Sequence, residues 1–271
     1  MSTATQSTTD KSAQKVLITG ASRGIGATYA KRFAKRGYQL VLVARSEEKL
    51  TQVAADIREE TGVNVEIMPA DLTLAADIAR VAEKLNKDTQ IEILVNNAGI
   101  AQRGNFTQQT PELISELIQL NVNALTQLAA AVAPRFVEQG NGSIINIGSV
   151  VGLAPEFGAT LYGASKAYVQ FLSQSLHQEL SPSGVYVQAV LPATTRTDIW
   201  AYSGIDVNTL PEVMEVADLV DAALVGFDRK ETVTIPPLHA PECWDELQAV
   251  RMALLGGLKQ QEPAERYTTG R

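Results

Sequence analysis

A short apolar strand, a glycine-rich turn and a helix follow one another at residues 15–26, which read KVLITGASRGIG. The apolar residues 16–18 are typical of a strand that is buried on both faces. The helix begins after the turn, so its first N–H groups face any anion that binds there. Gly20 permits the tight turn, Gly24 lets the backbone approach a diphosphate, and Gly26 lets helix and strand pack closely. The stretch therefore predicts an α/β fold with a dinucleotide site at this turn.

Strand and helix patterns alternate along the rest of the chain without a linker. Short apolar or alternating runs predict strands at 39–43, 63–67, 91–95, 143–147, 185–191 and 232–235. Helical spacing of apolar residues predicts further helices at 46–60, 74–86, 111–136, 159–180 and 216–228. This order predicts a Rossmann-type, doubly wound parallel sheet of about seven strands in three αβα layers. Ligands of such sheets bind beyond the carboxyl ends of the strands.

Composition excludes several classes of protein. A net charge of −7 and a pI near 5.0 argue against nucleic-acid or anionic-membrane binding. Cys243 is the only cysteine and His177 and His239 are the only histidines, so we expect no disulfide and no metal site. No apolar run reaches the roughly 18 residues of a membrane span. Residues 1–14 are rich in Ser and Thr, which predicts a disordered leader in a cytoplasmic protein.

Two arginines indicate which dinucleotide the turn holds. Proteins that bind an unsubstituted adenosine ribose usually carry Asp or Glu after the second strand. This chain has no acid there but has Arg45, and Arg23 in the glycine turn supplies a second guanidinium. Guanidinium groups match a phosphate with two hydrogen bonds. The sequence therefore predicts a 2′-phosphate, and hence NADP(H); the alternative is that both arginines are simply solvated.

The ends of the third and fourth predicted strands add polar and small residues. Asp71, followed by Leu72, is placed to accept a hydrogen bond from the adenine amino group, or else to cap the next helix. Residues 96–99, Asn-Asn-Ala-Gly, allow the backbone to come close to a cofactor. Their asparagine amides are also placed to brace the first turn, and a structural role is expected for Asn96.

Three residues near the end of the fifth predicted strand suggest the chemistry. Ser149 lies just past that strand, and Tyr162 and Lys166 are four residues apart on the next helix, so they share a face. A free tyrosine has a pKa of about 10. A lysine charge about 4 Å away, at an effective dielectric of about 20, favours the phenolate by about 4 kcal/mol. This is about three pKa units, so we expect Lys166 to lower the pKa of Tyr162.

Together, these motifs resemble the short-chain dehydrogenase/reductase family, in its compact single-domain branch. The resemblance covers residues 14–235 and rests on 19–26, 96–99, Ser149, the Tyr162/Lys166 pair and 192–197. It implies that Tyr162 is the general acid/base, that Ser149 orients the substrate oxygen, and that Lys166 binds the nicotinamide ribose.

The resemblance also assigns a fourth catalytic position to Asn121, which would hold a water that relays protons through Lys166. Asn121 is also placed simply to bond a neighbouring backbone, and Asn123 is a second candidate for the role. One departure from the family is Pro192-Ala193 in place of the usual Pro-Gly, which leaves the local backbone angle open. The residues predicted to hold the cofactor are Gly20, Ser22, Arg23, Gly24, Ile25, Gly26, Arg45, Asp71, Leu72, Asn97, Ala98, Gly99, Tyr162, Lys166, Pro192, Thr195 and Thr197.

These residues predict NADP(H)-dependent hydride transfer between the nicotinamide and a carbonyl or secondary alcohol, with reduction first. The expected pocket walls, residues 100–103, 150–157 and 198–215, are mostly apolar and favour a small hydrophobic substrate. Trp200 and Tyr202 either form a lid or pack against the neighbouring helix. The catalytic domain is expected at 15–258 and a flexible tail at 259–271.

Apolar residues lie nearly all round the predicted helix at 113–132, so one face is expected to meet a second copy in a homodimer or homotetramer. Two alternative functions remain. One is a 3-oxoacyl carrier-protein reductase, which would share every predicted catalytic residue. The other is a redox sensor that binds NADP(H) without turnover, which would not need the Ser149, Tyr162 and Lys166 set.

Overall fold

Seven parallel strands form one sheet in the computed structural model, which describes residues 13–268 except 102–103 and 201–203. Their order is β3-β2-β1-β4-β5-β6-β7, and every neighbouring pair is parallel. The order reverses between β1 and β4, where doubly wound sheets bind their ligands. The strands are β1 (Lys15–Thr19), β2 (Gln39–Ala44), β3 (Val65–Pro69), β4 (Ile91–Asn96), β5 (Gly142–Ile147), β6 (Val185–Val190) and β7 (Val233–Thr234).

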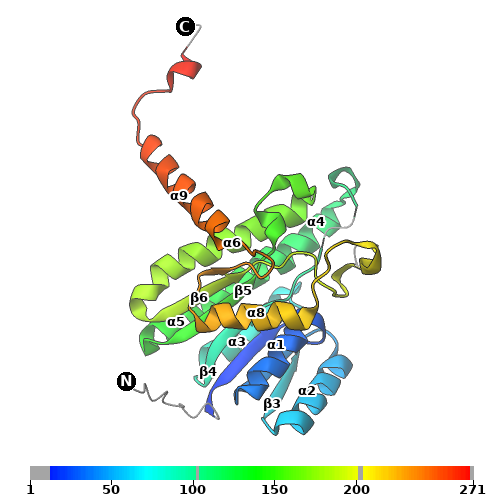
Figure 1. Ribbon diagram of the computed structural model, residues 1–271. Helices are drawn as coiled ribbons and strands as arrows, with labels where there is room; N and C mark the ends of the chain where they lie inside the picture. The colour runs from blue at the N-terminus through cyan, green and yellow to red at the C-terminus, as the bar shows by residue number, and fades with distance from the viewer. Residues whose placement is uncertain (1–12, 102–103, 201–203, 269–271) are drawn as a thin grey trace, which may run out of the picture. The chain divides into compact units, whose positions relative to one another are not determined.

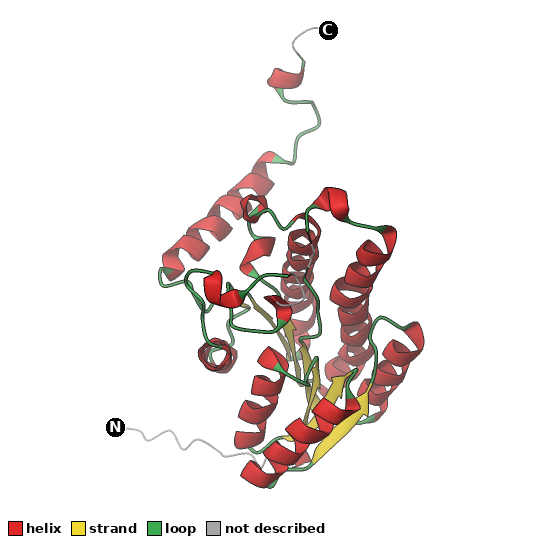
Figure 2. Ribbon diagram, turned by 90° about the vertical axis from the view of Figure 1, so that its right-hand side faces the viewer, coloured by secondary structure: helices red, strands yellow, loops and turns green. Residues whose placement is uncertain are grey.

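Helices cover both faces of the sheet and complete the three predicted layers (Figures 1 and 2). On one face Val16 and Ile18 of β1 pack with the first, second and eighth helices, while Leu17 points to the other face. This alternation is the period-two pattern of a strand that is buried on both sides. The helices of this layered body are α1 (Gly24–Lys35), α2 (Glu47–Thr61), α3 (Ala75–Lys87), α4 (Pro111–Ile118), α5 (Leu125–Gln139), α6 (Thr160–Leu180) and α8 (Val216–Asp228).

The helix predicted at 111–136 is not continuous. A π-helical turn, Gln119–Ala124, separates α4 from α5. Such turns insert one extra residue into a helix and occur frequently at functional sites. Periodicity of apolar residues does not reveal this turn, because α4 and α5 each keep the ordinary helical spacing. The other predicted strands and helices agree with the structure to within about two residues.

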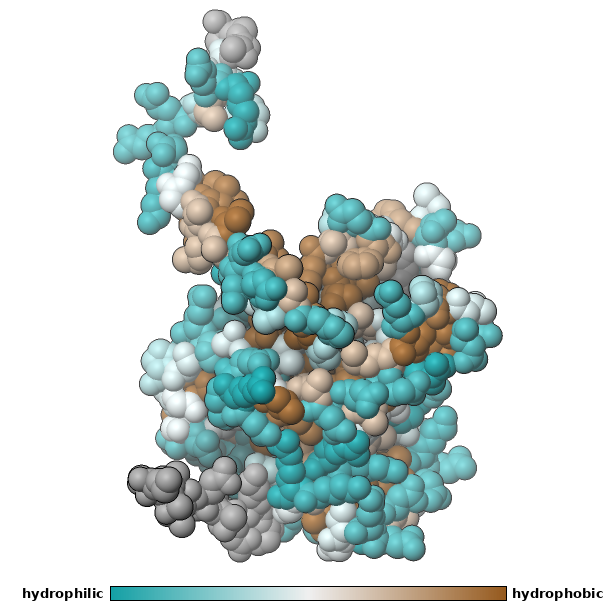
Figure 3. Space-filling view, viewed as in Figure 1, coloured by the Kyte–Doolittle hydropathy of each residue, from teal (hydrophilic) through white to brown (hydrophobic). Residues whose placement is uncertain are grey.

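The segment Pro237–Arg271 forms a second compact unit, separate from the unit Met1–Pro236. Its main element is α9 (Pro241–Gly257), which the sequence reading did not predict and on which no residue is buried. Figure 3 shows apolar side chains on this helix, and the large exposed ones are Leu247, Val250, Met252, Leu254 and Leu255. The structure thus divides the chain at 236–237, whereas the sequence placed the end of the catalytic domain at 258.

Among the described residues, no helix is both long and apolar enough to cross a membrane. Within the same part of the chain, no group of three or more His, Cys, Asp or Glu side chains is arranged to hold a metal ion. Residues 1–12 of the predicted leader lie outside the described part. Gln14 at its end already belongs to the sheet region, because its carbonyl accepts a hydrogen bond of 2.9 Å from the Gln39 N–H.

Candidate active site

The glycine turn between β1 and α1 forms a cradle that side chains would fill. Gly20 and Gly24 have φ values of 65° and 55°, in the left-handed region that favours glycine. A Cβ at Gly26 would lie 2.6 Å from Asn97 Nδ2 and even closer to the Gly20 carbonyl oxygen. A Cβ at Gly20 would lie 2.7 Å from the same Asn97 nitrogen. The bare backbone here, at the start of a helix, fits the diphosphate of a dinucleotide.

Asn97 and Thr19 lock this turn to the end of β4. Asn97 Nδ2 donates to the Thr19 and Gly20 carbonyls at 2.9 and 3.2 Å. Thr19 Oγ1 accepts from the N–H groups of Asn97 and Ala98, both at 3.0 Å. The predicted bracing of the first turn by this amide is confirmed. Asn96 is buried and bonds Asn146 Oδ1 at 3.0 Å, which agrees with the structural role expected for it.

The two predicted phosphate-binding arginines lie at the same edge of the sheet. Arg45 follows the last residue of β2 and is exposed, and Arg23 is the exposed residue just before α1. Arg23 forms an ion pair with Asp198, with Nη1 and Oδ2 3.2 Å apart. Ser22 and Ile25 complete the turn beside Arg23, and both are partly buried.

Asp71 does not cap α3, because that helix begins at Ala75 with Leu74 at its N-cap. Instead Asp71 Oδ1 accepts from the N–H and the hydroxyl of Thr73, at 3.0 and 2.8 Å. This is the Asx turn that an aspartate forms with the residue two positions on. Leu72 beside it is buried. The capping alternative is therefore wrong, and the adenine contact stays a prediction.

Ser149 and Tyr162 meet at the carboxyl edge of the sheet. Ser149 is buried two residues past β5, and its Oγ donates to the Pro192 carbonyl at 3.2 Å. Tyr162 lies in the first turn of α6, and the two side chains share a hydrogen bond. The strand end and the helix start thus bring together two groups that are 13 positions apart in the sequence.

Lys166 lies one turn further along α6 and is buried. Its Nζ donates to the Ile147 carbonyl at 2.8 Å and lies 5.5 Å from the centroid of the Tyr162 ring. A Cβ at Gly99 would lie 3.7 Å from this Nζ and 3.1 Å from Asn121 Oδ1. The end of β4, the π-helical turn and α6 therefore converge on one point beside Tyr162.

The pKa of Tyr162 differs from the expectation. Burial raises it to about 12, and the hydrogen bond with Ser149 offsets part of that rise. Burial also lowers the pKa of Lys166 to about 8, which leaves it mainly a cation at pH 7. The lowering expected from the lysine charge is not seen, because burial is the largest cause at Tyr162 and raises its pKa. The Tyr162 hydroxyl is consequently neutral at pH 7.

The π-helical turn aims Asn121 at the backbone that follows β4. Its Nδ2 donates to the Ile100 carbonyl and its Oδ1 accepts from the Ile100 N–H, both at 2.9 Å. The same Nδ2 lies 3.3 Å from Ser165 Oγ on α6. The side chain thus bonds neighbouring backbone, as one of the two alternatives for it proposed. Asn123 is exposed and bonds Gln119 Oε1 at 2.8 Å on the outer side of the helix.

The segment after β6 lies against both the catalytic group and the glycine turn. The Pro192 carbonyl accepts from the Val150 N–H at 2.9 Å, in addition to its bond with Ser149. A Cβ at Gly24 would lie 3.7 Å from Thr197 Cγ2. Among described residues other than glycine, positive φ occurs at Glu212 and Lys230. Ala193 thus adopts an ordinary backbone conformation where the family usually has glycine.

Apolar side chains on the predicted substrate side are only partly covered. Leu153 and Phe157 follow Ser149 and are 37% and 59% exposed. Trp200 Nε1 donates to the Thr195 carbonyl at 2.7 Å, which folds this residue back onto its own segment. Residues 102–103 of one expected wall, and Tyr202 of the expected lid, lie outside the described residues.

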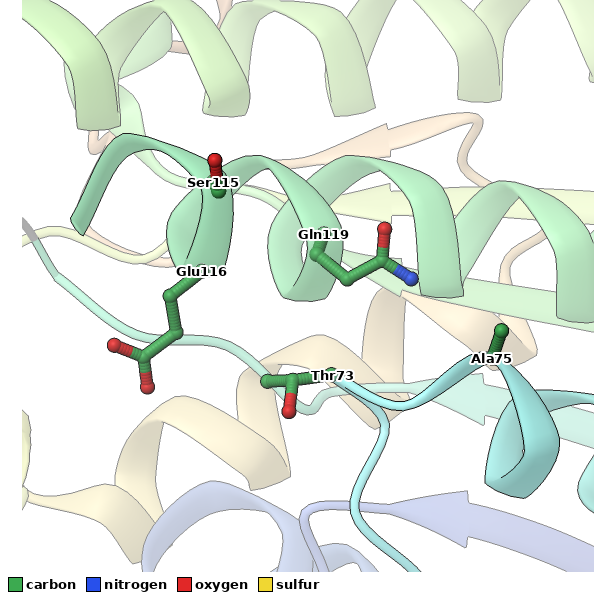
Figure 4. A pocket seen from close by; sticks show the side chains of 5 residues that line it. All are labelled: Thr73, Ala75, Ser115, Glu116 and Gln119. Carbon is green, nitrogen blue, oxygen red and sulfur yellow. The ribbon is translucent and has the colours of Figure 1, made fainter. Parts of the chain in front are cut away.

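A surface hollow of about 420 Å³ lies between the start of α3 and the end of α4 (Figure 4). It is lined by Thr73, Ala75, Ser115, Glu116 and Gln119. None of the predicted site residues lines it, although Thr73 is the partner of Asp71. The hollow is therefore separate from the group formed by Ser149, Tyr162 and Lys166.

Sequence reasoning missed three residues that support the site. Ser165 Oγ donates to the Tyr162 carbonyl at 2.7 Å and so joins Asn121 to the turn of α6 that carries the tyrosine. A Cβ at Gly152 would lie 2.7 Å from the Lys166 carbonyl carbon, so this glycine permits the 150–152 turn to pack on α6. Asp198 pairs with Arg23. The position of Ser165 next to Lys166 was a signal that could have identified it, whereas the other two depend on tertiary contacts.

A sequence model described as short chain dehydrogenase matches residues 14–207. The chain belongs to the short-chain dehydrogenase family. The members of this family are oxidoreductases that bind NAD(P)(H), and the glycine cradle described above fits such a dinucleotide. The family assignment predicted from the motifs is thereby confirmed.

Two solved structures of this family are close to the chain over nearly all of its length. A short-chain dehydrogenase from Sphingobium yanoikuyae in complex with NADPH is 64% identical, with a TM-score of 0.92 over 94% of this chain and 100% of that one. The bulky-bulky ketone specific alcohol dehydrogenase from Comamonas testosteroni is 56% identical, with a TM-score of 0.88 over 94% of this chain and 98% of that one.

The chain is also similar to curated family members of other substrate classes. The very-long-chain 3-oxoacyl-CoA reductase of Anas platyrhynchos is 38% identical over 180 residues, which are 65% of this chain. The chain spans only 58% of the length of that relative.

Proposed function

We propose that this short-chain dehydrogenase reduces a hydrophobic ketone to a secondary alcohol with NADPH, and catalyses the reverse oxidation with the same groups. The observation that carries the proposal is the buried Ser149–Tyr162 pair, with Lys166 one helical turn away from the tyrosine. When bound, NADPH supplies the hydride that the carbonyl carbon receives. The Tyr162 hydroxyl gives its proton to the carbonyl oxygen, which yields the alcohol.

Tyr162 supplies the proton in the reduction and accepts it in the oxidation. Burial raises its pKa to about 12, so the hydroxyl is protonated at pH 7 and able to act as the acid. Ser149 orients the substrate oxygen by a second hydrogen bond. The Lys166 cation holds the nicotinamide ribose. It also stabilises the negative charge on Tyr162 after the tyrosine has given up its proton. Asn121 positions the backbone at Ile100. It also holds a water that relays protons through Lys166.

The cofactor in this proposal is NADP(H) rather than NAD(H). Arg23 and Arg45 hold the 2′-phosphate at the edge of the sheet, and Asp71 with Leu72 holds the adenine. The backbone of residues 97–99 and the segment from Pro192 to Thr197 contact the nicotinamide half. The NADPH complex of the 64% identical relative supports this choice, as does Arg45 in place of an acid directly after β2.

The proposed substrate carries bulky apolar groups on both sides of its carbonyl. The 56% identical relative is a bulky-bulky ketone specific alcohol dehydrogenase. The exposed apolar side chains Leu153 and Phe157, just after Ser149, supply surface for such groups. A second candidate substrate is a 3-oxoacyl thioester, which the similarity to a 3-oxoacyl-CoA reductase supports.

The deciding experiment follows NADPH oxidation with a panel of bulky ketones, small ketones, aldehydes and 3-oxoacyl thioesters. Wild type and Tyr162→Phe are compared on each substrate. We expect turnover of bulky ketones by the wild type and its loss in the variant. Activity confined to the thioesters would favour the 3-oxoacyl reductase, and NADPH binding without turnover of any substrate would favour the redox sensor.

We also propose that the chain assembles into a homodimer or homotetramer, in the cytoplasm. Large side chains on α6 are exposed, with Phe171 at 75% and Tyr168 at 39%. The Tyr168 hydroxyl lies 3.0 Å from Thr126 Oγ1, so α5 and α6 present one common face. Light scattering at micromolar concentration should report a dimer or larger for the wild type and a smaller species for Phe171→Glu. A monomeric wild type would contradict the proposal.

A further inference from the structure

Asp198 is the one acidic side chain that forms an ion pair with Arg23 in the described part of the chain. The two residues come from opposite ends of the domain in sequence, the glycine turn and the segment after β6. These segments also touch beside the pair, since a Cβ at Gly24 would lie 3.7 Å from Thr197 Cγ2. The ion pair therefore connects the cofactor-binding turn to the segment that leads into the substrate side.

The segment around Asp198 has its own anchors. The Arg196 N–H donates to the Met214 carbonyl and the Met214 N–H donates to the Thr194 carbonyl, both at 2.9 Å. Trp200 folds back to the Thr195 carbonyl at 2.7 Å. Asp198 lies between these anchors with its side chain 61% exposed. Its carboxylate has Arg23 as its single ion-pair partner among the described residues.

Because both side chains are more than half exposed, the ion pair is weak and another anion can replace the Asp198 carboxylate at Arg23. The Arg23 side chain is 54% exposed, and an ion pair between two such groups contributes at most about a fivefold factor to an equilibrium. Carboxylate and phosphate both form charge-assisted hydrogen bonds with a guanidinium, but a phosphate monoester carries about 1.5 to 2 negative charges at pH 7 and a carboxylate carries one. A phosphate beside Arg23 would therefore compete with the Asp198 carboxylate for the guanidinium.

We propose that Asp198 is a specificity-determining residue for the cofactor, the partner that Arg23 exchanges for the 2′-phosphate of NADP(H). NADP(H) binding breaks this ion pair between the 194–200 segment and the glycine turn. NAD(H) lacks the phosphate and leaves the pair intact. Asp198 therefore competes with NADPH but not with NADH. The proposal rests on the proposed role of Arg23 in holding the 2′-phosphate.

The test is a fluorescence titration of NADPH and NADH with the full-length wild type, Asp198→Asn, Arg23→Ala and the double variant. Asp198→Asn should bind NADPH about two- to fivefold more tightly, the factor that an exposed pair contributes. Its affinity for NADH should stay the same. In the Arg23→Ala background the substitution should have no effect on NADPH, because the competition is for Arg23.

Two controls keep the result specific. Asp221→Asn breaks another Arg–Asp pair of α1, with Arg32 at 2.6 Å, and should leave both affinities unchanged. Asp198→Glu keeps the negative charge and should retain the wild-type ratio of NADPH to NADH affinity. Equal tightening for both cofactors, or tightening that persists without Arg23, would overturn the exchange and indicate simple repulsion by the carboxylate.

The role of Arg23 and its exchange of Asp198 for the phosphate can be disproved separately. If Arg23→Ala leaves NADPH affinity unchanged, Arg23 does not hold the 2′-phosphate, and the cofactor part of the proposed function falls together with the exchange. If Arg23→Ala weakens NADPH binding but Asp198→Asn does not tighten it, the exchange alone is wrong.

Discussion

The dinucleotide side and the substrate side of the cleft are built in different ways. On the dinucleotide side, strand ends are tied to one another by partly buried hydrogen bonds, such as those of Thr19 and Asn97 between β1 and β4. On the substrate side, apolar side chains such as Phe157 stand half exposed on short turns. The first side is ready for a ligand of constant shape. The second leaves room for substrates that differ, which fits a family whose members share one cofactor class.

The largest expected effect lies where the two sides meet, at Tyr162. Tyr162→Phe should lower kcat by about 10²- to 10⁴-fold, because the variant has no proton to give to the carbonyl oxygen. NADPH affinity should change little, since the dinucleotide side stays intact. Steady-state kinetics and cofactor titration measure the two quantities. As a control, Tyr168→Phe removes an exposed hydroxyl from the same helix and should keep the wild-type kcat. A near-normal kcat in Tyr162→Phe would show that Tyr162 does not donate the proton.

The next effect is a pH dependence of stability that comes from Lys166. Burial lowers its pKa from 10.5 to about 8, so the unfolded chain holds this proton more tightly than the folded one. The contribution of Lys166 to the free energy of unfolding therefore rises with pH between about 8 and 10.5 and is least favourable below pH 8. Lys166→Met should gain up to about 3 kcal/mol at pH 7 and lose that gain as the pH rises through this window.

Denaturant unfolding at pH 7, 9 and 10 measures this change. Lys49→Met replaces an exposed lysine and should show no such pH dependence. A gain in Lys166→Met that stays constant with pH would mean that the ammonium costs no stability. The same variant should also lose activity, which would show that Lys166 is needed for catalysis although its burial lowers the stability of the fold.

Overpacking of the glycine cradle should damage the dinucleotide side alone. The Cβ of Gly26→Ala would clash with the Gly20 carbonyl and lie 2.6 Å from Asn97 Nδ2. We expect a loss of about 1–3 kcal/mol in unfolding free energy and weaker NADPH binding. Thermal unfolding and cofactor titration measure both. As a control, Gly256→Ala on α9 has no atom within 4 Å of its new Cβ and should be tolerated. Unchanged NADPH affinity in Gly26→Ala would contradict the proposal that the glycine turn binds the dinucleotide.

The smallest effect is expected on the substrate side. Phe157→Ala removes a side chain that is 59% exposed, so it should raise KM for a bulky ketone by a few fold, about 1 kcal/mol or less. NADPH affinity should not change. Phe171→Ala on α6 removes an even more exposed ring and should leave KM unchanged. If Phe157→Ala weakened NADPH binding instead, the two sides would not be independent.

The same contrast explains what the sequence could predict. The parallel sheet follows from apolar runs that are local in the chain, such as Val16 to Ile18, and the glycine cradle follows from residues whose missing side chains have one geometric use. Ser149, Tyr162 and Lys166 were found because a strand end and a helical spacing place them together. Their protonation was not predictable, because burial of Tyr162 and Lys166 depends on the whole fold. Asp198 escaped notice for a similar reason, since its partner lies far away in the chain.

The π-helical turn at Gln119–Ala124 has a consequence for how this protein tolerates insertions and deletions. A turn of this kind carries one surplus residue, so the faces of α4 and α5 are out of phase by about 100° relative to a regular helix. Deletion of a single residue there would let the backbone revert to ordinary α geometry without breaking either helix. The chain would remain folded, yet the Asn121 amide would swing away from Ile100 and the loop after β4 would lose its clamp. One additional residue in this helix thus brings the Asn121 side chain to the backbone at Ile100.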